Sequence, residues 1–261
     1  MSFHTTDDGV RYFSFDSLPK SVVQAVFTRR GGLSPDPWNS LNVGGTVGDE
    51  RERVMENRFR AFRALGRDPR SMFDVWQVHS ADVVITSAPH FSMPPEHKAD
   101  AILTDKPDVT LFMRFADCVP ILLHDPRKAV VGIVHAGWQG TVKKILRETV
   151  RSMQVTYGSN PADVLAAIGP SIGPDHYEIG PDVIERVWAS FGGDSDALLQ
   201  PHDGRTHFDL WAANRLTLEQ AGVGQVEVAG LCTACATTDW YSHRAEKGKT
   251  GRFGALIGLS V

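Results

Sequence analysis

The sequence has few cysteines, no long apolar run and no large excess of either positive or negative charge. Three cysteines among 261 residues, Cys118, Cys232 and Cys235, are too few for a disulfide framework, so reduced thiols and a cytoplasmic location are expected. No apolar run reaches the ~20 residues of a membrane helix, and the first eight residues carry no signal-peptide pattern. Lysine and arginine (27) nearly balance aspartate and glutamate (31), which argues against nucleic acid or an anionic membrane as the main partner.

What the sequence does contain is the usual mixture of a globular protein. Hydrophobic residues make up 42% and charged residues 22%, which excludes disordered and fibrous classes. Neither an internal repeat nor a low-complexity stretch divides the chain. The length suits one large domain, so we expect a single catalytic domain over residues 1–261 and a monomer.

Strand-length apolar runs and helical patterns follow one another without a regular repeat. Apolar and β-branched residues dominate four runs that we expect to form buried strands, at 109–115, 120–123, 129–134 and 164–168. Apolar residues recur at helical spacing between Asp49 and Gly66 and between Val142 and Met153. This irregular order favours a mixed-sheet α+β architecture over a doubly wound sheet.

The first of these expected helices carries a basic run. A solvated helix face is the plain interpretation of such a run, which comprises Arg51, Arg53, Arg58, Arg60 and Arg63. The run therefore does not by itself indicate a binding surface.

His135 lies where the expected strand at 129–134 gives way to a glycine-containing turn. Side chains at such a junction often face a cleft, and free backbone N–H groups at a helix start attract anions. Gly137 and Gly140 would let the backbone approach a ligand closely. The alternative is a structural turn that uses glycine for its dihedral angles, beside a histidine that is hydrogen-bonded nearby.

Two further side chains are candidates: we expect Cys118 at the end of an apolar strand and His79 in a strand or at its end. Each has a structural alternative, as a hydrogen-bonded histidine and as a small buried cysteine. The spacings among His79, Cys118 and His135 match no structural zinc finger. Three such ligands from separated loops do suit a catalytic metal site, in which a fourth position stays open for water or substrate.

Cys232 and Cys235 form a C-x-x-C unit without a second such unit to complete a zinc ribbon. We interpret this unit as a packing or site-lining element. A structural zinc site would need two more ligands, for which His243 is the nearest candidate in the sequence. The remaining histidines, among them His176, show no ligand spacing.

Phrases spread over almost the whole sequence resemble the YfiH-like family. They are WQVHSADV, ADAILTDKP, FADCVPILLHDP, VVGIVHAGWQGTV, IGPSIGPDHYEIGPDV, DLWAANRLTL and CTACATTDWYSHRAEKGKTGR. Its members have been described as multicopper polyphenol oxidoreductase (laccase-like) proteins and as purine nucleoside phosphorylases. The resemblance implies packed mixed β-sheets flanked by helices, in a layered α/β/β/α sandwich. It also implies a metal ion held by His79, Cys118 and His135.

The resemblance further implies an enzyme that cleaves adenosine, inosine, guanosine or methylthioadenosine with phosphate and also deaminates adenosine. Zinc is the expected metal, because two neutral imidazoles and one thiolate leave a +1 centre that can activate water. Asp117 is expected to act with this centre by orienting His135 or His79. Arg58 and Arg244 are expected to bind phosphate, since guanidinium groups match phosphate oxygens.

Three other functions remain open on the same residues. A set of two histidines and one cysteine resembles a copper site, which would suit a laccase-like polyphenol oxidase. Cys118 as nucleophile with His135 as base would suit a hydrolase that edits peptidoglycan precursors. A closed structural metal would suit a binding protein without turnover.

Overall fold

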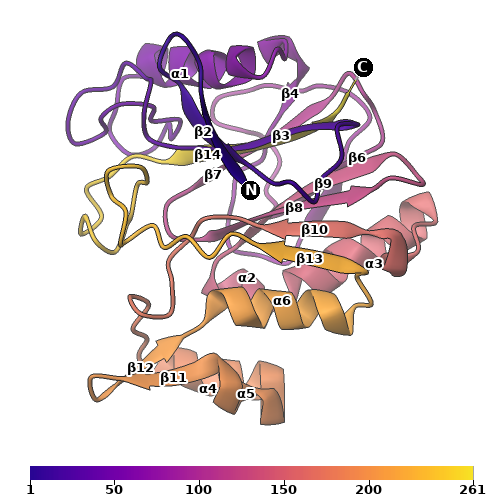
Figure 1. Cartoon of the computed structure of the whole chain (residues 1–261), viewed down its shortest axis with the longest axis vertical. Coiled ribbons are helices and arrows are strands. Elements are labelled where there is room, and N and C mark those ends of the chain that lie inside the picture. Colours follow the sequence, from indigo (N-terminus) through magenta and orange to yellow (C-terminus); the bar gives the residue numbers. More distant parts are fainter. Residues whose placement is uncertain (261) are drawn as a thin grey trace.

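Two six-stranded β-sheets, packed face to face, form the centre of the computed structural model, which describes residues 1–260 (Figure 1). The first sheet contains, in spatial order, β1 (Ser2–Thr5), β2 (Arg11–Ser14), β3 (Val22–Phe27), β14 (Phe253–Leu259), β7 (Thr110–Phe115) and β4 (Met72–Phe73). The second contains β13 (Gln225–Val228), β10 (Leu165–Ile168), β8 (Val119–Asp125), β9 (Val130–Ala136), β6 (Ala101–Thr104) and β5 (Val83–Ile85). Both sheets are mixed, because β4–β7, β5–β6 and β10–β13 pair in parallel and the other neighbours antiparallel.

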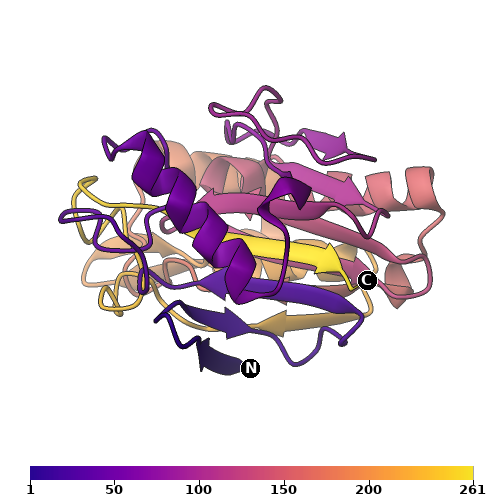
Figure 2. The ribbon, with the colours of Figure 1, turned by 90° about the horizontal axis from the view of Figure 1, so that it is seen from above.

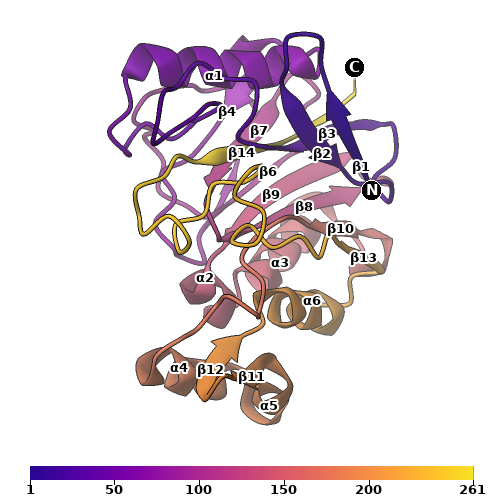
Figure 3. The ribbon, with the colours of Figure 1, turned by 60° about the vertical axis from the view of Figure 1, so that its left-hand side comes forward.

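Helices cover the outer face of each sheet. α1 (Arg51–Ala64) lies over the first sheet (Figure 2). Phe62 of this helix packs against Phe112 of β7. α3 (Ile145–Tyr157) and α6 (Leu210–Gln220) cover the second sheet (Figure 3). An apolar cluster fills the space between the two sheets. These four layers confirm the predicted α+β class and the α/β/β/α sandwich.

The remaining elements are short or lie outside these layers. Below α6 in Figure 3 lie α4, α5 and the β11–β12 hairpin. In the described part of the chain, residues 1–260, three short 3₁₀ helices occur in connections. The bounds are α2 (Trp138–Val142), α4 (Pro181–Phe191), α5 (Ser195–Leu198), β11 (Leu199–His202), β12 (Arg205–Phe208), η1 (Pro69–Ser71), η2 (Pro161–Asp163) and η3 (Gly192–Asp194). Within residues 1–260, none of the helices has the length and apolar character needed to cross a bilayer.

The central strands are buried on both faces. Every residue of β8, β9 and β14 is buried, because each strand has a layer above and a layer below it. Such strands read in sequence as continuous apolar runs rather than as an alternation. This is why the predicted strands at 109–115, 120–123, 129–134 and 164–168 coincide with β7, β8, β9 and β10.

The two predicted helices form with altered details. α1 spans most of the predicted range, but Arg58, expected on its solvated face, is buried. The pattern from Val142 to Met153 divides into α2 and α3, because Lys144 adopts a left-handed backbone conformation with φ 61°. A residue in that conformation interrupts a right-handed helix.

Two connections carry the chain from the first sheet to the second. The segment from β4 to β5 includes His79, and the segment from β7 to β8 includes Cys118. β9, which carries His135, lies in the second sheet between β8 and β6. The crossovers therefore deliver side chains from distant parts of the sequence to one place beside β9.

Candidate metal centre and its cavity

The structure brings His79, Cys118 and His135 together. Their ligand atoms all lie within 4.8 Å of one another. His79 Nε2 is 3.9 Å from Cys118 Sγ, and the centroids of the two imidazole rings are 5.0 Å apart. Donor atoms at these separations can share a single metal ion after small side-chain adjustments.

Asp100, the residue before β6, joins the two segments that carry the histidines. Its buried carboxylate accepts hydrogen bonds from the backbone N–H groups of His79 (3.0 Å) and Ser80 (2.6 Å) and from Nδ1 of His135 (2.8 Å). The bond to Nδ1 fixes the imidazole ring and leaves Nε2 of His135 available for a metal. The same carboxylate helps to hold His79 at φ 58°, a conformation that few residues other than glycine adopt.

Asp117, which we expected to orient a histidine, makes other contacts. Its carboxylate accepts hydrogen bonds from Thr233 Oγ1 (2.7 Å) and from the backbone N–H of Arg244 (2.6 Å). The orienting contact to His135 comes from Asp100 instead. Asp117 therefore ties the cysteine-bearing crossover to the segment between β13 and β14, which forms another wall of the site.

The charged groups of the centre alter one another's ionisation. Burial raises the pKa of the Cys118 thiol, but the charge of His135 and hydrogen bonds with both histidines outweigh burial and lower this pKa to about 6. Burial lowers the pKa of His135, but the charge of Cys118 and the bond to Asp100 raise it to about 9. Burial also opposes ionisation of Asp100, yet its bond to His135 lowers its pKa to about 2. Cys118 is thus favoured as a thiolate, the form that ligates metals.

The two glycines of the His135 turn have different surroundings. A Cβ atom on Gly137 would lie 2.8 Å from Cys118 Sγ and 3.1 Å from His79 Cδ2, so only glycine lets the backbone pass this close to the centre. A Cβ atom on Gly140 would meet no atom nearer than 3.4 Å. Gly140 is buried in α2 and does not line the cavity described below. Gly137 does not line this cavity either, so its close approach is to Cys118 and His79, and the approach of both glycines to a bound ligand stays a prediction.

A cavity of about 740 Å³ opens beside the three candidate ligands. Trp76, Met93 and Tyr177 contribute apolar and aromatic surface to its wall. Against one aspartate, Asp117, the lining contains five arginines, which are Arg51, Arg58, Arg114, Arg244 and Arg252. A cavity of this size suits a small molecule, and the excess of guanidinium groups suits an anionic one, although the whole chain has a formal charge of −4.

Both arginines predicted to bind phosphate line this cavity, but their side chains have protein partners. Arg58 donates from Nε to the Val43 carbonyl (3.0 Å) and from Nη1 to the Asp74 carboxylate (3.2 Å). Burial lowers the pKa of the Arg58 guanidinium to about 10. Arg244 is exposed and donates to two backbone carbonyls, at 3.4 and 3.0 Å.

Three residues of the site were not found from the sequence. The contact between Asp100 and His135 depends on the pairing of β6 with β9, which the sequence does not predict. Arg114 donates to Asp74 at 2.8 Å and faces the cavity from the end of β7, and Arg252 lies just before β14. No spacing in the sequence links these residues to His79, Cys118 or His135, since only the sheet order brings them together.

The chemistry of the three donors fits a metal ion. Imidazole nitrogen and thiolate sulfur are the ligands preferred by zinc and also by copper. Three protein ligands, rather than four, leave one coordination position for water or substrate. The centre lies against the cavity, so a small molecule in the cavity would meet the ion at that position.

The family model described as "Multi-copper polyphenol oxidoreductase laccase" matches residues 23–260. The chain belongs to this family. Among relatives of the family, a purine nucleoside phosphorylase of Deinococcus radiodurans is 43% identical over 92% of this chain and 90% of its own length. The purine nucleoside phosphorylase YlmD of Bacillus subtilis is 37% identical over 92% of this chain and 89% of its own length.

Solved structures share the fold of this chain. YlmD from Geobacillus stearothermophilus superposes with a TM-score of 0.92 at 32% identity, and 99% of each chain is covered. A hypothetical protein YfiH from Bacillus licheniformis gives a TM-score of 0.91 at 33% identity, with 98% of each chain covered. The likeness spans all four layers of the sandwich and confirms the predicted resemblance.

Proposed function

We propose that the chain is a zinc-dependent purine nucleoside phosphorylase that also deaminates adenosine. The observation that carries the proposal is the position of the His79–Cys118–His135 cluster beside an arginine-lined cavity. The names of the relatives from Deinococcus radiodurans and Bacillus subtilis support it. The proposed substrates are phosphate and adenosine, inosine, guanosine or methylthioadenosine.

In phosphorolysis a phosphate oxygen attacks C1′ of the ribose while the bond from C1′ to the purine nitrogen breaks. The electron pair of that bond leaves with the purine, and the products are the free base and ribose 1-phosphate. The guanidinium groups of the cavity wall supply the positive charge that places phosphate and stabilises the transition state. Trp76 and Tyr177 offer aromatic surface against which a purine can pack.

In deamination water adds to C6 of the adenine ring, ammonia leaves and inosine is formed. Zinc, when bound by His79, Cys118 and His135, supplies Lewis acidity for this step. The protein's own contribution is to hold the donors: Asp100 fixes the His135 ring through Nδ1, and Gly137 leaves room for Cys118. Zinc is favoured over copper because two neutral imidazoles and one thiolate are a common zinc set with a +1 net charge.

The test is to incubate pure protein with adenosine, with and without phosphate, and to follow the bases and nucleosides by chromatography. We expect adenine only in the presence of phosphate, and inosine in both incubations. The His79→Ala variant, which removes one ligand, is the control for contaminating enzymes. If wild type forms no more adenine, inosine or hypoxanthine than this variant, the proposed function is wrong.

One observation favours a second candidate, a cysteine hydrolase of peptidoglycan precursors. In this arrangement Cys118 would be the nucleophile and His135 its base, while Asp100 is hydrogen-bonded to His135 as the orienting carboxylate of a catalytic triad is. Chelation separates the two candidates. A thiol nucleophile keeps its activity after the metal is removed and loses it on alkylation, whereas the zinc enzyme loses its activity with the metal.

The family description also keeps copper-dependent phenol oxidation as an alternative. Reconstitution with copper under anaerobic conditions, followed by visible spectroscopy and oxygen uptake on phenols, tests it. Copper–thiolate absorption together with phenol-dependent oxygen uptake would favour an oxidase. Zinc in the purified protein, without such oxygen uptake, would favour the phosphorylase.

A further inference from the structure

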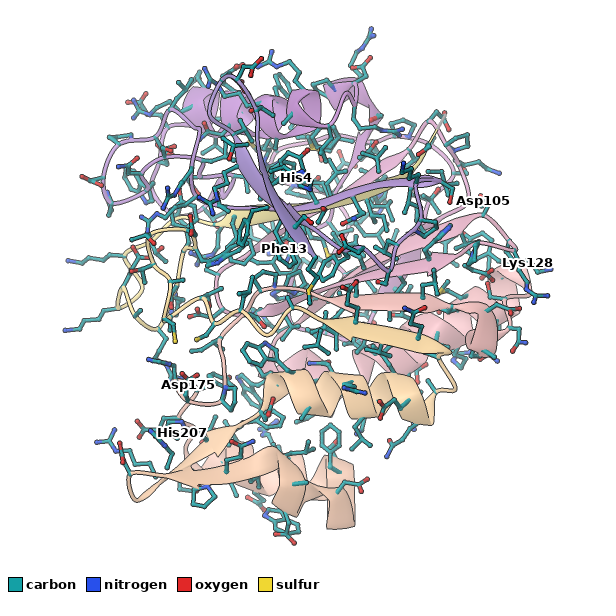
Figure 4. The ribbon with its side chains drawn as sticks, in the orientation of Figure 1. His4, Phe13, Asp105, Lys128, Asp175 and His207 are labelled. Atoms are coloured by element: carbon teal, nitrogen blue, oxygen red, sulfur yellow. The ribbon has the colours of Figure 1, made fainter. Side chains whose placement is uncertain are left out.

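A second group of potential metal ligands lies outside the cavity. Asp175 and His176 come from the segment between β10 and α4, and Cys232 and Cys235 come from the segment between β13 and β14. One ligand atom from each of the four residues lies within 4.8 Å of all the others. Figure 4 labels Asp175, which lies on a loop between the sandwich and the hairpin that carries His207. None of the four residues lines the cavity.

Three separations within this group match those of a tetrahedral site. Cys235 Sγ lies 3.5 Å from His176 Nδ1 and 3.4 Å from Asp175 Oδ2, and Cys232 Sγ lies 3.8 Å from His176 Nδ1. Zinc bonds of 2.0–2.3 Å place neighbouring ligands of a tetrahedron roughly 3.3–3.8 Å apart. The Asp175 Oδ2 to His176 Nδ1 pair, at 2.9 Å, is closer, and a small opening of this contact would admit an ion.

We propose that Asp175, His176, Cys232 and Cys235 form a second zinc site, closed and structural. Four protein ligands fill a tetrahedron, in contrast to the three at the cavity. Two cysteine sulfurs and an imidazole select zinc over magnesium or calcium, which prefer an all-oxygen shell.

The backbone around the group is already organised. Ser171 and Cys232 form a parallel bridge, in which the Ser171 N–H donates to the Leu231 carbonyl and the Thr233 N–H donates to the Ser171 carbonyl. The Gly173 N–H donates to Cys232 Sγ at 3.2 Å. A backbone amide directed at a cysteine sulfur stabilises the thiolate form that binds metal. The two segments are therefore held together before any ion binds.

The site would fasten one wall of the cavity. Tyr177, which follows His176, lines the cavity, and the Arg244 guanidinium donates to the carbonyls of His176 and Glu178. On the other segment, the Thr233 hydroxyl donates to Asp117, next to Cys118. A metal ion joining the two segments would hold these residues in place without contacting substrate.

The sequence did not reveal this group. We expected a packing role for the C-x-x-C unit and regarded His243 as the nearest possible extra ligand. His243 lines the cavity instead, and the additional donors are Asp175 and His176, more than fifty residues before the cysteines. Only the pairing of the two segments places them together.

Metal analysis of the full-length protein, purified with zinc under inert gas, tests the proposal. With both sites filled we expect about two zinc ions per wild-type chain, and about one in the double variant C232S/C235S and in H176A. H79A should lose only the ion at the cavity. H202A is the matched control for H176A, because His202 is similarly exposed and also lies beside an aspartate but has no cysteine neighbour, and it should keep both ions.

The comparison between variants separates this proposal from the proposed enzyme. If the cavity held no zinc, wild type would contain about one ion and C232S/C235S none, and the second site would still be supported. Equal zinc content in C232S/C235S and wild type would overturn it. So would a Cys232–Cys235 disulfide in protein purified under inert gas with zinc.

Alkylation with iodoacetamide, read by peptide mass mapping, gives a measurement on the unmutated chain. We expect a chelator to speed the modification of both Cys232 and Cys235 at least about tenfold, because a zinc-bound thiolate is shielded from the reagent. An equal rate with and without chelator would contradict a metal at these sulfurs.

Discussion

Asp100 accepts hydrogen bonds from the backbone N–H of His79 and from the ring of His135. Asp117 instead accepts hydrogen bonds from Thr233 and Arg244, in the segment that forms a wall of the site. The two carboxylates flank the same centre, but they act on different groups. Their contributions to metal binding should therefore differ, although both residues lie next to or within hydrogen-bond reach of a ligand.

We predict that Asp100→Asn weakens zinc binding about 10–100-fold, because it removes the charge that fixes His135 and the backbone of His79. Asp117→Asn should change zinc affinity by less than about threefold, since asparagine keeps an acceptor and tolerates the positive φ at this position. Competition with a chromophoric chelator measures both affinities. Equal losses in the two variants would show that Asp100 has no special connection to the histidines.

A substitution at Gly137 tests whether the close approach of the backbone to Cys118 is needed for zinc binding. Gly137→Ala places a methyl group 2.8 Å from Cys118 Sγ, so we expect zinc affinity to fall at least about tenfold. Gly140→Ala, inside the short helix α2 that begins just after Gly137, meets nothing nearer than 3.4 Å and should stabilise the fold by about 0.5–1 kcal/mol. Zinc titration and urea unfolding of both variants distinguish a local clash from general damage. Unchanged zinc affinity in Gly137→Ala would argue against the close approach.

Among the elements, α1 was predicted correctly as a helix, but the burial of one of its arginines was not predicted. The helix forms where apolar periodicity predicts it, but Arg58 turns inward from a run of arginines. Both Arg58 and Arg114 pair with the Asp74 carboxylate, and Asp74 lies outside the helix. Periodicity places a residue on a helix, whereas a buried ion pair depends on the neighbouring segment.

We therefore predict that Arg58→Ala lowers the free energy of unfolding by about 3 kcal/mol or more, because it breaks a buried ion pair and leaves a gap beside Phe112. Arg63→Ala, in the same helix, removes only an exposed pair with Glu56 and should cost about 1 kcal/mol or less. Urea unfolding measures both. Similar small losses would show that Arg58 contributes little to the fold and would strengthen its assignment as a phosphate binder.

For the whole molecule, the strands were predictable because both faces of the central strands are covered, which produces continuous apolar runs. Cys118 and His135 were predictable as candidates because they lie at the ends of such runs, and all three candidate ligands stand in phrases of a known family. His79, which we expected in a strand or at its end, lies instead in the connection between β4 and β5. Asp100 and the Asp175–His176 pair were not, because their proximity to the other ligands depends on strand pairing and on bridges between distant segments. A single domain, a monomer and a cytoplasmic location stay predictions.

Anomalous X-ray diffraction at the zinc edge, from crystals of the protein grown with zinc, tests the metal centre most directly. We predict a peak about 2.0–2.3 Å from Nε2 of His79, Sγ of Cys118 and Nε2 of His135, with no fourth protein ligand. A map without a peak among these three atoms, in crystals that contain zinc, would contradict a metal centre at the cavity.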